Sequence, residues 1–210
     1  MTGKHLGWVT TVALLGFVAS CAIVPFIVPQ RKTVSPEFDK LPNRRVAVLV
    51  FVDPSTLFDY PYARFELASF VGDKLYAEMA QRALNTDVVD PRDVEDFLQR
   101  NRDAEIDPQE VGLAFDADYV LFLEILTFQI RDPRQPQFLR GRISAAVSMH
   151  DIRCEPDELC RFELTPVTCV HPDGAPVILT ATNSAFIREA TYRAFAEQVA
   201  RKFYEHVVEL

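Results

Sequence analysis

The sequence predicts an α/β (α+β) fold in a single domain, with a mixed β-sheet of about five strands and helices packed on its faces. An N-terminal membrane-targeting segment precedes this domain. Apolar runs rich in β-branched residues alternate with helical patterns from Arg44 onward. Strands alternate with helices in the first half of this region, which favours parallel pairing, and follow one another in the second half, which favours antiparallel hairpins. The chain of 210 residues is 49% hydrophobic and 25% charged, as expected of one globular domain with a tail.

The first half of the domain is predicted to contain two strands and three helices. The run 46–51 is apolar throughout, so we expect a strand that is buried on both faces. Residues 63–84 carry apolar side chains every four positions, which predicts an amphipathic helix, and a short strand follows over 86–89. Asp90-Pro91 and Asp107-Pro108 each combine a capping carboxylate with a proline suited to a first helical turn, so we expect helices to begin there.

The second half is predicted to contain strands and a closing helix. Residues 119–131 are apolar on both faces at first, with Glu124 inside this part, and then alternate between apolar and polar. Residues 143–152 alternate again, so 132–142 is expected to link the two strands as a long hairpin loop. Residues 159–170 supply one or two further strands, and the apolar stripe of 184–208 predicts a long final helix.

The N-terminus has the composition of a secretory address. A short basic start precedes an uncharged apolar stretch from Leu6 to Ser20, which is the arrangement of a signal peptide. The stretch ends in Val18-Ala19-Ser20-Cys21, which resembles the bacterial lipobox. This resemblance implies cleavage after Ser20 and acyl chains, such as palmitate, on Cys21. Burial of those chains would hold the protein at a membrane.

An uncleaved anchor is the alternative for this segment. The apolar run continues beyond Cys21 to Val28, and residues 6–28 are long enough to span a bilayer. We therefore assign residues 1–20 to a signal peptide, or to part of a 6–28 transmembrane anchor. Residues 21–43, with several prolines and charges, are assigned to a lipid-anchored tether, and residues 44–210 to the α/β domain.

The domain resembles a small α/β domain of bacterial envelope proteins. The resemblance rests on Arg45–Phe51 before a long helix, on Val88–Val94 and on Ala117–Leu121. It is similar to the periplasmic part of the curli secretion channel, the lipoprotein activator of penicillin-binding proteins and the N-terminal domain of the Tol-Pal translocation protein. Glu124 replaces a glycine often found in that group, and a cysteine-bearing loop replaces a short glycine turn. The resemblance implies an envelope lipoprotein that binds other proteins and is not an enzyme.

The cysteines beyond Cys21 allow two kinds of site. Cys154 and Cys160 bracket a turn-like loop, and an exported domain would lie where disulfides form, so we expect this pair to close, with Cys160 and Cys169 as the rival pairing. With His171 added, these residues have the ligand types of a zinc site but lack its usual close cysteine spacing. We therefore predict no metal and no cofactor, and keep a zinc-binding protein as an alternative.

Two segments could contact a partner. The loop after the first strand offers the apolar residues Leu57, Phe58, Tyr60 and Tyr62; they would either meet a partner or cover the start of the next helix. The hairpin loop carries Arg131, Arg134, Arg140 and Arg142. These arginines would either meet anionic lipid or an acidic partner, or form a solvated hairpin tip.

Composition narrows the function. The net charge of −8 argues against nucleic-acid binding, and no two of the seven glycines are placed for a phosphate-cradling loop. We find no catalytic set of residues. We predict a membrane-tethered, non-catalytic lipoprotein of the cell envelope, periplasmic or surface-exposed, that acts by protein–protein contact in envelope assembly, transport or cell-wall enzyme regulation. The alternatives are a subunit of an oligomeric secretion assembly, which would make the chain a homo-oligomer, and a hydrolase that uses Glu124 or zinc.

Overall fold

The computed structural model describes residues 31–101, 107–132, 134–154 and 160–209. The chain divides into two compact units, which are considered separately: Ser35–Tyr204, which carries the α/β fold, and a second unit in which the structure describes residues 31–34 and 205–209. In the described ranges, no helix has both the length and the apolar character needed to cross a membrane.

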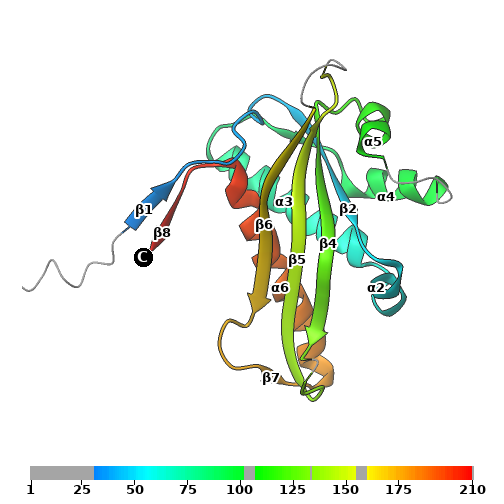
Figure 1. The fold of residues 1–210 in the computed structure, drawn as a ribbon, viewed down its shortest axis with the longest axis vertical. Helices are drawn as coiled ribbons and strands as arrows, with labels where there is room; N and C mark the ends of the chain where they lie inside the picture. Colours follow the sequence, from blue (N-terminus) through cyan, green and yellow to red (C-terminus); the bar gives the residue numbers. More distant parts are fainter. Residues whose placement is uncertain (1–30, 102–106, 133, 155–159, 210) are drawn as a thin grey trace, which may run out of the picture. The chain divides into compact units, whose positions relative to one another are not determined.

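A mixed sheet forms the centre of the larger unit (Figure 1), as the sequence predicts. Its strand order is β3-β2-β4-β5-β6, and β7 lies beside part of β5. β2 pairs in parallel with β3 and β4, whereas β4, β5 and β6 pair antiparallel. The strands are β2 (Arg45–Phe51), β3 (Asp87–Val88), β4 (Tyr119–Arg131), β5 (Phe138–Asp151), β6 (Arg161–His171) and β7 (Val177–Ile178).

Helices cover the two faces of this sheet unequally. The long helices α3 (Ala63–Gln81) and α6 (Ala181–Ala200) lie behind the sheet in Figure 1, on the face that we call the inner face. The shorter helices α4 (Pro91–Arg100) and α5 (Pro108–Ala114) pack against the other face, the outer face, at its β2–β4 side. A further short helix, α2 (Pro54–Asp59), follows β2.

Two helices, α4 and α5, begin with the predicted chemistry, and α2 begins in the same way although its residues were expected to form a loop. The carboxylates of Asp53, Asp90 and Asp107 each accept a hydrogen bond from a backbone N–H two residues ahead, and a proline starts each helix. The alternation in β2 confirms that this strand is buried on both faces. Val46 and Val48 pack into the main core on the inner face, and Leu49 packs into a second core under α4 and α5.

Beyond α4 and α5, the outer face of β4, β5 and β6 has no helix over it among the described elements (Figure 1). The strand register places polar or small side chains from neighbouring strands side by side on this face. These side chains are exposed or half-buried: Glu124, Thr127, Gln129, Arg142, Ser144, Ala146, Glu163 and Thr168. Glu124 lies within β4, as expected, and its side chain is exposed on this face.

The predicted final helix is too long. α6 ends at Ala200, and a short 3-10 turn, η3 (Arg201–Phe203), leads out of it. In the second unit, β8 (His206–Glu209) pairs antiparallel with β1 (Arg31–Val34). The helical stripe continues through Val207 in the sequence, but pairing with a strand far away in the chain replaces the helix there. Residues 31–34 of the predicted tether therefore form a strand that pairs with β8.

The predicted tether also contributes to the α/β unit. Phe38 and Leu41 are buried in the main core, so the compact unit begins at Ser35 and not at Arg44. The N–H groups of Glu37 and Phe38 both donate to the carbonyl of Lys202, at 2.8 and 3.2 Å. This segment has too few apolar residues, and no periodicity, to signal burial in the sequence.

Candidate functional site

The lipidation site predicted at Cys21 lies outside the described residues, as do the signal peptide and the anchor segment. The structure therefore bears only on the sites predicted within the domain. Among these are the cysteines, the aromatic loop and the arginines of the β4–β5 hairpin.

The cysteines form the expected pair. Cys154 and Cys160 are joined by a disulfide between β5 and β6, with their Cα atoms 5.5 Å apart. Cys169 is free and buried, which removes the rival pairing. Burial and the nearby charge of Asp173 raise the pKa of the Cys169 thiol to about 11, so this thiol stays protonated at neutral pH. The disulfide takes two of the four groups of the alternative zinc site, and no metal-binding cluster occurs in the ranges that the structure describes.

The aromatic segment expected as a loop is partly helical, since Leu57 and Phe58 lie on α2, and its residues divide between the two interpretations. Leu57 packs against the main core, and the Tyr60 ring lies 5.0 Å from the Phe128 ring, so these residues cover the domain. Phe58 and Tyr62 remain 87% and 72% exposed. Their role in binding a partner stays a prediction.

A serine–histidine pair that the sequence did not predict lies on the outer face. The Ser148 hydroxyl lies 3.1 Å from Nε2 of His150, two residues along β5, and the Phe122 ring meets the imidazole edge-to-face. Burial, and then the charge of Arg161, lower the pKa of His150, which favours the neutral ring at neutral pH. Ser148 is almost completely buried, so a substrate would not reach its hydroxyl. We interpret this pair as a satisfied buried contact. The alternation of β5, which places both residues on one face, was its only sequence signal.

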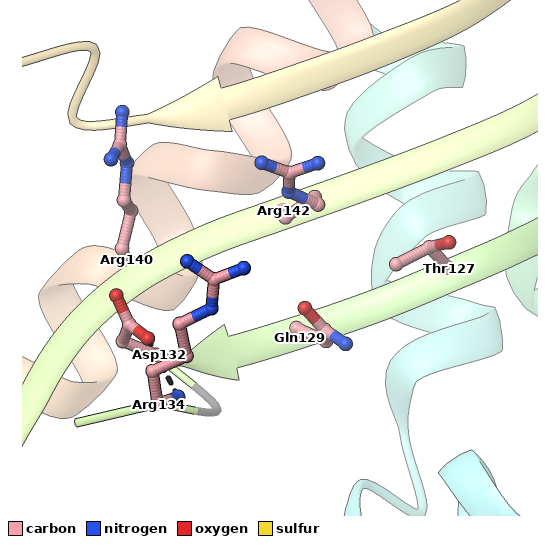
Figure 2. Close-up of a pocket in the computed structure, with 6 residues that line it drawn as sticks. All are labelled: Thr127, Gln129, Asp132, Arg134, Arg140 and Arg142. Atoms are coloured by element: carbon pink, nitrogen blue, oxygen red, sulfur yellow. Dashed lines mark hydrogen bonds between the residues drawn. The ribbon is translucent and has the colours of Figure 1, made fainter. Parts of the chain in front are cut away.

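The arginines of the β4–β5 hairpin lie close together at the end of the outer face that is next to the β4–β5 turn. They line a hollow of about 540 Å³, which we call the arginine hollow (Figure 2). Its lining comes from the end of β4, the turn and the start of β5: Thr127, Gln129, Asp132, Arg134, Arg140 and Arg142. Of the four arginines singled out in the sequence, only Arg131 is not among them.

Strand geometry brings these side chains together. Arg140 and Arg142 are two residues apart on β5 and therefore point to the same face. Gln129 is directly opposite Arg142 across the strand pair. The expected loop over 132–142 is shorter than predicted because β5 already begins at Phe138. Two arginines that we expected on a loop are thus fixed on a strand.

The positive charges of the arginines in the hollow are only partly offset by neighbouring negative groups. Arg134, Arg140 and Arg142 form no ion pair with any described carboxylate. Arg140 is half-buried, and its Nη2 donates to the carbonyl of Asp173 at 3.3 Å. Its buried Nε has no hydrogen-bond partner among the described residues. The hollow is therefore a concentrated positive region on a protein of net charge −8.

Comparisons with known proteins give matches among solved structures only. No protein-family model matches the chain, and no curated protein matches it. Among solved structures, the PelC dodecamer from Paraburkholderia phytofirmans is 10% identical, with a TM-score of 0.45 over 83% of this chain and 98% of that chain. Lipoprotein GNA1162 from Neisseria meningitidis is 13% identical, with a TM-score of 0.38 over 75% of this chain and 99% of that chain. A minor lipoprotein from Acinetobacter baumannii is 8% identical, with a TM-score of 0.33 over 76% and 91%.

Proposed function

We propose that this protein is a non-catalytic binding protein of the bacterial cell envelope, held at a membrane through Cys21 and acting by contact with another protein. The observation that carries the proposal is the outer face of β4, β5 and β6, over which the described part of the chain places no helix beyond α4 and α5. Its side chains stand on paired strands of one sheet, which hold them in fixed positions, and the face is broad and polar. Such a surface suits a protein partner better than a small substrate, which usually binds in an enclosed apolar pocket.

The Cys154–Cys160 disulfide supports a location outside the cytoplasm. Disulfides persist in oxidising compartments such as the periplasm and the cell surface, and are rare in the cytosol. This location agrees with the secretory address and the lipobox-like sequence that ends at Cys21.

The anchor is tested by the intact mass of the protein extracted from membranes. We expect the mass of residues 21–210 plus acyl chains, and we expect the Cys21→Ser variant to lack the acyl mass. A full-length, unmodified mass would contradict the lipid anchor and would favour the transmembrane alternative.

The contact surface is tested by photo-crosslinking in the cells that make the protein. A photoreactive amino acid at Ser144 or at Thr168, both on the outer face, should give one and the same covalent adduct. The control position is Gln81, which is exposed at the end of α3 on the opposite side of the sheet. Adducts from Gln81 alone would contradict the proposed surface. Substrate turnover by the purified protein without a partner would contradict the non-catalytic role.

A further inference from the structure

We propose that the arginine hollow is a binding site for a phosphate group, presented either by an anionic lipid headgroup or by a soluble phosphate. This inference concerns the end of the same outer face that lies next to the β4–β5 turn, and it does not depend on the proposed protein contact. Four properties of the hollow carry the inference: its charge, its fixed geometry, its set of donors and its openness to solvent.

The charge of the hollow calls for an anion. Three guanidinium groups and one carboxylate line it. That carboxylate, Asp132, offsets one of the three positive charges, and its Oδ1 accepts a hydrogen bond of 2.8 Å from the N–H of Arg134, which closes the turn. The other carboxylates of the described protein do not pair with these arginines, although the chain has more acidic than basic residues. Grouping like charges is unfavourable unless a counter-charge binds among them.

Two of the three arginines, Arg140 and Arg142, are also held in place on β5. Arg140 and Arg142 flank Gly141, whose missing side chain lets β5 meet α6 closely. A Cβ at Gly141 would lie 1.9 Å from Oγ1 of Thr191. The strand therefore lies tightly on the helix at this position, and Arg140 is further fixed by its hydrogen bond to Asp173. Donors held on rigid strands lose less conformational freedom on binding than arginines on a mobile loop.

The donor set matches a phosphate better than a carboxylate. A guanidinium presents a planar fork of N–H donors, and one fork satisfies both oxygens of a carboxylate. A tetrahedral phosphate group offers more oxygens in different directions, so it can accept from several arginines together. Thr127 and Gln129 line the same hollow and add a hydroxyl and an amide. These groups can bind further phosphate oxygens, or hydroxyl groups of the alcohol to which the phosphate is esterified.

The shape limits how the phosphate is presented. The hollow lies on the surface of two strands, next to the turn that joins them (Figure 2). A phosphate can therefore enter while the rest of the molecule that carries it stays outside. This fits a headgroup at the surface of a lipid assembly as well as free phosphate.

Binding is tested with the full-length protein in nonionic detergent by calorimetric titration. In one arm the titrant is inorganic phosphate, and in the other the detergent micelles contain either phosphatidylglycerol or phosphatidylcholine. We expect saturable binding that Arg142→Gln weakens about tenfold, the effect of losing one charge-assisted hydrogen-bonding group. Arg142→Lys keeps the charge but not the fork, so we expect a smaller loss.

The matched control is Arg100→Gln, which removes the same charge from an exposed position on α4. It should leave binding unchanged, and equal thermal unfolding curves will show that the variants fold. Binding of phosphate alone identifies a soluble source, and additional binding of phosphatidylglycerol but not phosphatidylcholine micelles, lost in Arg142→Gln, identifies the lipid source. The proposal is overturned if neither phosphate nor phosphatidylglycerol binds saturably, or if Arg100→Gln weakens binding as much as Arg142→Gln. Tighter binding of polyglutamate than of phosphate would also overturn it in favour of an acidic protein partner.

Discussion

Gly141 shows how one residue sets the distance between a strand and a helix. A Cβ at this position would lie 2.7 Å from Cβ of Thr191, an atom that cannot swing aside, and the Thr191 hydroxyl donates to the carbonyl of Ile187 at 2.6 Å. We therefore predict that Gly141→Ala lowers the free energy of unfolding by roughly 2 kcal/mol, the usual cost of overpacking a core. Urea unfolding of the variant measures this loss.

The control for this prediction is Gly174→Ala, because nothing lies within 4 Å of the position that its Cβ would take. That variant should change the free energy of unfolding by no more than about 0.5 kcal/mol. Equal stability of the two variants would show that β5 and α6 can separate at little cost.

Cys169 gives a second prediction at this scale. Its buried thiol, whose pKa is raised to about 11, should not react with a thiol reagent in the native protein at neutral pH. In the Cys21→Ser variant, denaturation without a reductant should release one reactive thiol, and denaturation after reduction should release three. Spectrophotometric thiol titration counts them. Two or three thiols without reductant would mean that Cys154 and Cys160 are not bonded.

At the scale of the elements, sequence patterns suffice to predict the bounds of some strands and the starts of some helices. β4 has the predicted bounds, and α4 and α5 begin where an aspartate and a proline provide the starting chemistry. These signals are local, because they depend on side-chain alternation and on neighbouring residues. The ends of the domain were not predicted, because Phe38 and Leu41 become buried, and β1 pairs with β8, through contacts between residues far apart in the sequence.

Glu37 binds both η3, the turn that follows α6, and the strand β6. One carboxylate oxygen of Glu37 lies 2.9 Å from Nζ of Lys202, whose side chain is only 7% exposed, and the other accepts the N–H of Thr165 at 2.7 Å. The Thr165 N–H belongs to the edge strand β6, so the carboxylate also occupies part of the sheet edge.

We predict that Glu37→Gln lowers the free energy of unfolding at neutral pH by about 1 kcal/mol, because Lys202 would lose its counter-charge while 36% of the Glu37 side chain is exposed to solvent. The matched control is Glu163→Gln, which breaks an exposed ion pair with Arg161 and should cost at most a few tenths of a kcal/mol. Urea unfolding of both variants decides; equal small losses would show that Lys202 is adequately solvated without its partner.

At the scale of the whole molecule, the candidate site could be anticipated only in part. The sequence singled out the hairpin arginines, but it placed them on a loop. The hollow forms because β5 extends to Phe138 and sets Arg142 opposite Gln129, a register that depends on the pairing of two long strands. Charge in the sequence could thus indicate the kind of ligand, whereas the arrangement of the donors required the fold.

Ion pairs that join distant elements make the stability of the molecule depend on pH. Lys74 on α3 lies 2.6 Å from Glu78 and 2.5 Å from Glu197 of α6. Burial alone would raise the pKa of Glu78 and of Glu197, but hydrogen bonds and charge from Lys74, together with a neighbouring arginine on each, outweigh it and hold both pKa values below 4.5. Burial likewise favours a higher pKa for Glu37, and hydrogen bonds from Lys202 and Thr165 outweigh it and lower that pKa.

These shifts predict that acid destabilises the protein in two stages. Because the unfolded state binds protons more tightly at His150, whose native pKa is lowered by burial, the free energy of unfolding should begin to fall as the pH drops below about 6.5. The three glutamates have lowered native pKa values, so their contribution is present above their ordinary pKa of 4.5 and is lost as the pH falls through the native values. Urea unfolding between neutral pH and pH 3 measures both stages. His150→Gln should remove the first stage and leave the second, and a free energy of unfolding that stays constant from neutral pH to below pH 4 would contradict the linkage.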